Sequence, residues 1–378
     1  VSKPVSLTGG FTLTNWITPS WTANQTILDG QNAYRPLTVN ADNVRINGFV
    51  IRNGNATGSG GVGGGLFIGA VNVVDRATLA NLRLENNVAS TIDSGQGGGL
   101  AVEMGNTFNI TADLRLSNVT VISNTATTGS LDASGGGMSI RAAGNSRLNV
   151  EMVNVTVQEN TAGNDFSSHG GGIVLSLNGG TAKVRQSRIL ANHAARIKTF
   201  LGGPSRGGGI SLINGNLQLE NVLIARNSGE RGDALWVEPG NLSNVTVGMN
   251  YVTIADNYRV AGDAAAAVRM EGAQILLLLA NTLISGNPTA LEAQNNAQPP
   301  EVDFLSVLID NDVSNVISGT ITTNGTPLRG SAAYANAAAG DYRLSAASDA
   351  IDAGNDLPPP VDLDGEFRPK GAATDIGA

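Results

Sequence analysis

The chain has 378 residues, enough for two or three ordinary domains, but its composition argues against that arrangement. Glycine contributes 49 residues, about twice its usual share, while charged residues make up only 14%, against about 25% in typical proteins. The net charge of −8 argues against a nucleic-acid partner, which requires a basic face. The longest strongly apolar run, residues 275–280, is too short to cross a bilayer, so we expect no transmembrane segment.

The first 40 residues contain short strand-like runs, such as Val5–Thr14 and Thr26–Gly30, that do not follow the repeat beginning after them. The repeat described below predicts a solenoid, and a solenoid must protect the edges of its terminal strands. We therefore predict that residues 1–40 form an N-terminal cap that leads into the first coil.

A repeat then runs over residues 41–312. Each unit has an opening Asn, a stretch rich in β-branched residues or leucine, and a closing Asn six residues later, as in Asn118-Val-Thr-Val-Ile-Ser-Asn124. The closing Asn returns every 30–37 residues along the chain. The closing asparagines are Asn53, Asn87, Asn124, Asn160, Asn192, Asn227, Asn257 and Asn287.

A glycine triplet leading into another strand lies between successive units, as at Gly97–Val102 and Gly135–Ile140. A third strand often precedes the opening Asn, as at Asn216–Leu219. Each period therefore holds about three short strands and no helical stretch. Leucine-rich repeats are shorter, and propeller blades need four strands, so this period favours one coil of a parallel β-helix.

The side-chain pattern within each unit also indicates a solenoid. Val119 and Val121 occupy alternate positions of a strand and are predicted to point into the bore, whereas Thr120 between them faces solvent. We therefore predict an all-β fold, a right-handed parallel β-helix of about 8–9 three-strand coils with N- and C-terminal caps.

The closing asparagines are predicted to share one corner of the solenoid. Asn tolerates the left-handed backbone conformation, and its side chain can bond nearby backbone groups. Stacked coils would place these amides about 4.8 Å apart, where they can hydrogen-bond as a ladder. The glycine triplets are predicted to form another corner, where backbones approach closely.

Residues 313–378 leave the repeat and form a C-terminal segment that could cap the other end of the solenoid. Its motifs are Ser348-Asp-Ala-Ile-Asp-Ala-Gly-Asn355, Val361-Asp-Leu-Asp-Gly-Glu-Phe-Arg-Pro369 and Asp375-Ile-Gly-Ala378. Together with the repeats, this segment resembles bacterial secreted right-handed parallel β-helix proteins with a choice-of-anchor Q type C-terminal segment. Asp349 stands where that family usually has Pro, and the chain stops before the family's Tyr-Glu pair. The resemblance implies a secreted or cell-surface bacterial protein and supplies no catalytic residues.

Enzymes built on this scaffold place carboxylates and basic residues on the outer face of neighbouring coils. The best such cluster in this sequence is Glu159 with Arg188, Arg226 and Asp256. The alternative is that these are scattered, solvated charges on a polar face. The chain has only four lysines, so an extended basic groove for polyuronates is not expected.

Two further groups of residues raise the question of a metal. The only histidines, His169 and His193, fall in the loop regions of successive coils, without a nearby carboxylate cluster. Asp362 and Asp364 begin a run similar to a calcium loop, but no bidentate Glu follows at the EF-hand position. Turn chemistry, in which Asp bonds backbone ahead of Gly, explains that run equally well. We expect no cofactor, with calcium as the alternative.

Two classes of function remain open. The first is a structural or adhesive protein outside the bacterial cell, which could assemble into a homo-oligomer or a fibre. The second is a carbohydrate-active enzyme, a polysaccharide lyase or hydrolase, or a glycan-binding module that does not turn its ligand over. In that case the partner is an extracellular polysaccharide, bound beside the variable loops that stack on one side of the rod. The scarcity of charged clusters favours the first class.

Overall fold

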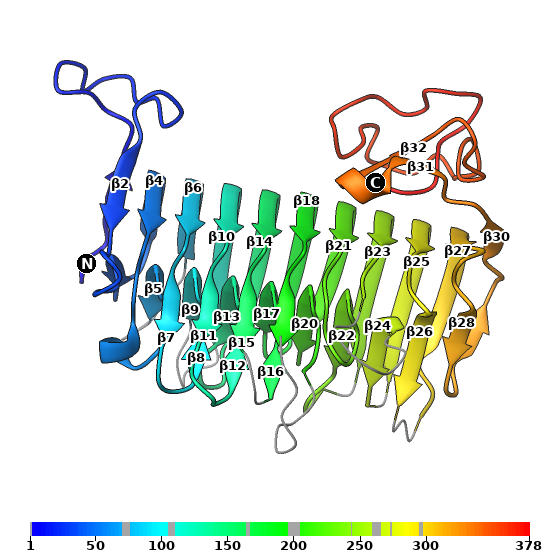
Figure 1. Cartoon of the computed structure of the whole chain (residues 1–378), viewed down its shortest axis with the longest axis horizontal. Coiled ribbons are helices and arrows are strands. Elements are labelled where there is room, and N and C mark those ends of the chain that lie inside the picture. Colours follow the sequence, from blue (N-terminus) through cyan, green and yellow to red (C-terminus); the bar gives the residue numbers. More distant parts are fainter. Residues whose placement is uncertain are drawn as a thin grey trace.

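The computed structural model describes residues 2–69, 76–104, 110–163, 167–195, 205–242, 244–258, 266–272, 274–294 and 298–378. Its strands are stacked side by side along one axis (Figure 1). Neighbouring strands of the stack pair in parallel and follow one another from coil to coil. The prediction of an all-β parallel β-helix is confirmed.

Two long sheets form the body of the stack. Sheet A has 13 strands: β1 (Ser6–Thr8), β4 (Val44–Arg52), β6 (Arg76–Glu85), β10 (Thr111–Ile122), β14 (Arg147–Gln158), β18 (Thr181–Leu190), β21 (Asn216–Ala225), β23 (Val245–Ala255), β25 (Ile275–Ser285), β27 (Glu301–Asp310) and β29 (Thr322–Asn324), with β2 (Thr26–Asp29) beside β4 and β30 (Leu328–Gly330) beside β27. Sheet B has ten strands: β3 (Leu37–Val39), β5 (Leu66–Gly69), β9 (Leu100–Met104), β13 (Met138–Ala142), β17 (Ile173–Ser176), β20 (Ile210–Ile213), β22 (Leu235–Glu238), β24 (Ala266–Glu271), β26 (Thr289–Gln294) and β28 (Asn315–Ser318).

Two short sheets lie within segments that the sequence suggested were loops. Sheet C comprises β7 (Val88–Ser90), β11 (Thr125–Thr127), β15 (Thr161–Gly163) and β19 (His193–Ala195), and sheet D comprises β8 (Gly95–Gln96), β12 (Ala133–Ser134) and β16 (Ser168–His169). The remaining elements are two single-turn 3-10 helices, η1 (Thr57–Ser59) and η2 (Ala337–Ala339), and an antiparallel pair formed by β31 (Tyr334–Asn336) and β32 (Asp341–Leu344). Residues 193–206, the longest of the variable loop segments in the sequence, lie partly outside the described residues.

The coil differs from the predicted one in how its strands are divided. The strand expected before the opening Asn and the strand after it form one continuous strand, as in β14 and β21. The opening residue bends this strand because it has a positive φ, 55° at Asn154 and 53° at Asn221. Asn adopts this left-handed conformation more readily than most residues. One residue per coil therefore turns sheet A around the bore.

The bore is filled by the alternating apolar positions that the sequence indicates. Val119 and Val121 are buried, and the register pairs them with Val155 and Val157 of the next coil. Thr120 lies between them on the outer face and pairs with another threonine. The same two inward positions recur along the rod, so one continuous hydrophobic core runs through it.

A ladder of buried asparagine side chains runs along one corner. Nδ2 of Asn124 donates to Oδ1 of Asn160 at 3.0 Å and to the carbonyl of Leu84 at 3.0 Å. The backbone N–H of Asn124 donates to the same Oδ1 at 2.9 Å. This pattern of amide-to-amide bonds links six of the eight closing asparagines, namely Asn87, Asn124, Asn160, Asn192, Asn227 and Asn257.

The structure corrects the ladder at both ends. The register aligns Asn53 with Asn86, so Gly54 stands in the ladder position and donates its N–H to Oδ1 of Asn87. Asn287 donates Nδ2 to the carbonyl of Asn257, but its own Oδ1 is buried without a hydrogen-bond partner among the described residues. Neither residue joins the repeated amide-to-amide pattern.

The left-handed conformation predicted for the closing asparagines lies one residue earlier. The residues with positive φ, from 49° to 65°, are Asn86, Ser123, Glu159, Ala191, Arg226, Asp256 and Gly286. This turn directs the following Asn into the protein, where the amide meets the amides of neighbouring coils. At this corner one residue therefore adopts the left-handed turn and the next forms the amide ladder, whereas the sequence pattern assigned both roles to the closing Asn.

The opening asparagines of the first coils form a second ladder that the sequence pattern did not predict. Nδ2 of Asn81 donates to Asn47 at 2.7 Å, Asn118 donates to Asn81 at 3.0 Å, and Asn154 donates to Asn118 at 2.8 Å. This ladder is partly exposed, and it ends where Gln186 replaces the opening Asn. We expect it to contribute less to stability than the buried ladder, because water can replace its bonds.

The glycine triplets form the tight corner before sheet B. Gly135 has a φ of 67°, and a Cβ there would lie 2.1 Å from the carbonyl oxygen of Met138. A Cβ on Gly136 would lie 2.3 Å from the carbonyl oxygen of Gly171 in the next coil. Side chains are therefore excluded both by the turn and by the stacking of coils.

The C-terminal segment, residues 331–378, lies along the side of the stack over β21 to β27 and not over its end (Figure 1). Strands β28, β29 and β30 still pair with β26 and β27, so the boundary predicted at residue 312 falls inside the stack.

The outer row of sheet A changes under the segment. It reads Arg83, Thr120, Thr156 and Arg188 in the earlier coils and Leu223, Thr253, Leu283 and Leu308 in the later ones.

This change of side chains explains where the segment docks. Leu283 and Leu308 are buried against Ala350 and Ile376 of the segment. Leu223 is buried in a second small cluster with Tyr342. Removing these apolar side chains from water stabilises the docked position.

We predict that Asn160→Ala lowers the free energy of unfolding by about 2–4 kcal/mol, because it leaves several buried donors and acceptors without partners. The measurement is the urea midpoint of each variant, followed by circular dichroism. Asn154→Gly, in the partly exposed ladder, is the control and should cost at most about 1 kcal/mol. Equal losses in the two variants would contradict the role assigned to the buried ladder.

We predict that Leu283→Asp detaches the C-terminal segment, because docking would bury an unpaired carboxylate. Limited proteolysis should then cut within residues 331–378 at least tenfold faster, while circular dichroism shows the β-helix intact. Thr156→Asp, at the same position of an uncovered coil, is the matched control. An unchanged cleavage rate in folded Leu283→Asp would argue against this docking.

Candidate functional site

The four residues of the predicted catalytic cluster lie on coils that follow one another. Glu159, Arg226 and Asp256 each occupy the positive-φ corner position, and Arg188 lies on the outer row of β18. The corner position of the coil between Glu159 and Arg226 belongs to Ala191. Because neighbouring strands are about 4.8 Å apart, Glu159 and Arg226 are separated by roughly two such steps.

Three members of this cluster contact the C-terminal segment. Nη2 of Arg226 donates to the carbonyl of Ala337 at 2.6 Å. The hydroxyl of Tyr342 donates to Oδ2 of Asp256 at 2.9 Å, and Arg188 pairs with Asp364 at 2.7 Å. Burial, reinforced by Asp256, raises the pKa of Tyr342 to about 12, so it stays a donor at neutral pH. These side chains dock the segment.

Glu159 lies apart from them, in a cavity of about 380 Å³ that it shares with Ser123 and His193. Its Oε1 accepts from Gln158 at 2.7 Å, and its Oε2 faces the Ser123 hydroxyl at 3.5 Å. Glu159 is the one carboxylate among the described residues that line this cavity. Glycoside hydrolysis by the usual mechanism needs two carboxyl groups, and the described lining supplies one of them.

The two histidines have different partners. His169 lies in β16, where its Nε2 is 2.8 Å from Nη1 of Arg206 and its ring stacks on Trp236 at 5.6 Å. Nδ1 of His193, in β19, is 2.7 Å from the hydroxyl of Ser228. Burial, followed by the positive charge of Arg206, lowers the pKa of His169 to about 4. His169 is therefore a neutral, packed side chain at physiological pH.

A network of charges that sequence reasoning missed surrounds this histidine on the outer face of sheet B. Arg269 is largely buried and pairs with Glu271 and Glu292, each at 2.8 Å. Glu271 also pairs with Arg231 at 3.1 Å and approaches Arg206 at 3.8 Å. Arg269 and Glu271 lie on the same strand, β24, and the register of sheet B places Glu292 of β26 beside Arg269. Because these charged side chains pair with one another, we interpret the network as a structural feature of sheet B.

The two aspartates considered for calcium make contacts typical of a turn. Oδ1 of Asp362 accepts the backbone N–H groups of Asp364 and Glu366 at 2.9 and 2.8 Å. Oδ1 of Asp364 binds Arg188. Within the described ranges, no group of three or more His, Cys, Asp or Glu side chains is placed to hold a metal ion. The contacts of Asp362 and Asp364 are those that the turn interpretation predicts.

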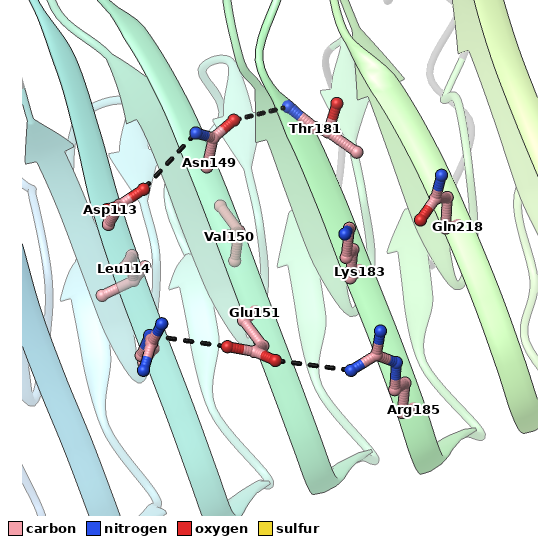
Figure 2. Close-up of a pocket in the computed structure, with 10 residues that line it drawn as sticks. Asp113, Leu114, Asn149, Val150, Glu151, Thr181, Lys183, Arg185 and Gln218 are labelled. Carbon is pink, nitrogen blue, oxygen red and sulfur yellow. Dashed lines mark hydrogen bonds and ion pairs between the residues drawn. The ribbon is translucent and has the colours of Figure 1, made fainter.

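Another hollowed surface lies on the outer face of sheet A, before the bend. A cavity of about 560 Å³ follows β10, β14 and β18 (Figure 2). Along one side of the cavity, Glu151 lies between Arg115 and Arg185, at 3.4 Å from each. Along the other, Asn149 donates to Asp113 at 3.4 Å and accepts from the N–H of Thr181 at 3.2 Å.

A second cavity of about 590 Å³ continues this surface toward the C-terminal end and shares Lys183, Arg185 and Gln218 with the first. It is more apolar because Gly248 leaves a gap in the outer row and Leu278 follows on the next strand. A Cβ on Gly248 would have no neighbour within 4 Å. We call the two cavities together the sheet A groove; it follows the rod axis across several coils.

No protein family model matches this sequence, and a search of curated proteins finds no relative for it. Across the described residues, no helix is long and apolar enough to span a membrane. The assignment of a function therefore depends on the geometry of the sheet A groove and of the residues around it.

We predict that His169 makes the fold less stable in acid. Between pH 6.5, its ordinary pKa, and about 4, the unfolded chain binds a proton that the folded chain does not. Stability should therefore fall as the pH falls through this window. His169→Phe keeps an aromatic ring against Trp236 but cannot titrate, so the loss of stability between pH 7 and 5, measured by urea midpoints, should shrink. An identical loss in both proteins would contradict the lowered pKa.

Proposed function

We propose that this chain is a structural and adhesive protein of the bacterial cell surface or extracellular space. In this proposal the sheet A groove holds an extended, uncharged polysaccharide without turning it over. The resemblance of the C-terminal segment to choice-of-anchor Q type segments supports export and display outside the cell. A rigid rod with a repeated outer surface also suits a protein that adheres to other surfaces.

The observation that carries the proposal is the mutual pairing of four charged side chains in the groove. Arg115, Glu151, Arg185 and Glu220 alternate in sign along neighbouring strands, with N···O distances of 3.4–3.5 Å. A charged ligand would have to break these pairs, and each side chain that lost its partner would be left uncompensated. A neutral polymer can instead form hydrogen bonds with polar side chains of the lining such as Gln218.

The shape of the groove also suits such a ligand. The two cavities overlap and run along the rod, so a polymer could lie across many coils at once. The apolar surface around Gly248 and Leu278 can receive the C–H face of a sugar ring. Many weak contacts on a rigid surface give adhesion without catalytic groups.

A polysaccharide-degrading enzyme is the second candidate, and Glu159 in its cavity beside His193 is the observation that favours it. A carboxylate next to an imidazole can exchange protons with a substrate. The proposal ranks lower because Arg188, Arg226 and Asp256 contact the C-terminal segment.

We predict that Gly248→Phe weakens polysaccharide binding at least tenfold, because the ring fills the gap in the groove. The Cβ meets no other atom there, so the fold should tolerate the change. The measurement is co-sedimentation with a panel of insoluble neutral polysaccharides. Gly58→Phe, also at a glycine with open space, is the matched control.

The same incubations separate the two candidate functions. Binding without new reducing ends, lost in Gly248→Phe and kept in Gly58→Phe, supports the adhesive proposal. Release of reducing ends that stops in Glu159→Gln would overturn it in favour of the enzyme. Equal binding by Gly248→Phe and the unchanged protein would show that the sheet A groove is not the binding site.

A further inference from the structure

The two ends of the stack each terminate in three short strands at equivalent positions. In sheet A, the long bent strand of the inner coils is divided in two at both ends. At the C-terminal end, β29 pairs with the first half of β27 and β30 with its second half. At the N-terminal end, β1 pairs with the first half of β4 and β2 with its second half. Sheet B ends in β28 and in β3.

The outer edges of these six strands pair with no other strand of the described chain. The C-terminal segment leaves the last coil open because it docks on the side of the rod. Leu328 of β30 is 47% exposed, and Ile27 of β2 is 43% exposed. Unpaired parallel edges present backbone donors and acceptors that can template another chain.

We propose that copies of this chain join head to tail, with β29, β30 and β28 of one copy pairing with β1, β2 and β3 of the next. The β-helix then continues through the junction without a break. This inference goes beyond the proposed function, because the groove can bind a polymer whether or not the rods join.

The register of the stack supports this pairing at two positions, between β30 and β2 and between β28 and β3. Following the paired residues from strand to strand, Ile27 and Leu328 belong to one row of sheet A. Leu37 and Ile317 likewise belong to one row of sheet B. A junction in register therefore brings exposed apolar side chains together in sheet A and extends a row of the core in sheet B.

The charges at the two ends are complementary. The last coils carry Glu301, Asp303, Asp310 and Asp312, with Arg329 as a positive side chain among them. The first coils carry Lys3, Arg35, Arg45 and Arg52, with Asp29 and Asp42 as negative side chains. The C-terminal end is therefore net negative and the N-terminal end net positive. This favours head-to-tail contact and disfavours the joining of two like ends.

The geometry also determines the kind of assembly. A head-to-tail contact uses two different surfaces of each copy, so a junction that does not close into a ring produces an open filament. Each copy adds the same rod, and the sheet A groove is repeated along the filament. An adhesive surface repeated in this way binds a long polymer with increased avidity.

The test is assembly as a function of protein concentration, measured by sedimentation velocity and negative-stain electron microscopy. The unchanged protein should form rods that lengthen in steps of one copy. Ile27→Lys and Leu328→Asp should each weaken assembly at least tenfold, because each places a charge in the apolar row at the junction. The double variant should regain assembly, since the two new charges face each other there.

Thr120→Lys is the matched control. Thr120 lies in the same outer row but in a middle coil, away from both ends, so this variant should assemble normally. Circular dichroism verifies that each variant is folded. An unchanged protein that stays monomeric up to millimolar concentration would overturn the proposal. Assembly that neither single variant weakens, or that the double variant does not restore, would overturn the proposed junction. Polysaccharide binding by the monomer would persist in either case.

Discussion

The buried amides at one corner constrain the whole rod. An asparagine side chain placed in an apolar interior must satisfy two donor hydrogens and an acceptor oxygen, because an unpaired buried polar group costs about 1–3 kcal/mol. Each of the six ladder amides bonds to the ladder residue of a neighbouring coil and to a backbone carbonyl. The coils must therefore stack in one register, and that register determines which side chains meet on every outer face.

The outer faces show how much follows from that stacking. The alternating charges of the sheet A groove lie on different strands and approach one another through the register alone. The ion pair between Arg269 and Glu292 on sheet B arises in the same way. Where the outer row changes from threonine and arginine to leucine, the C-terminal segment covers the rod. The groove, this ion pair and the docking site thus all depend on the register in which the coils stack.

The sequence alone predicts the repeat, the parallel β-helix and the inward-facing apolar residues, because these depend on local alternation and period. It does not show which of two adjacent corner residues points inward, and Asn53 was assigned to the ladder position that Gly54 occupies. The docking of the segment on Leu283 and Leu308 depends on contacts between residues far apart in the chain. The same limit applies to the groove, since Gly248 becomes a gap only when strands are stacked around it.

Amide hydrogen exchange tests the central claim most directly, because the ladder uses backbone N–H groups at a corner. The N–H groups of Asn124, Asn160 and Asn192 each donate to the Oδ1 of the next ladder residue. If the ladder holds the coils in register, these amides should exchange as slowly as those in the middle of sheet A, through unfolding of the rod. Exchange as fast as that of the exposed turns, while the strands stay protected, would contradict the account.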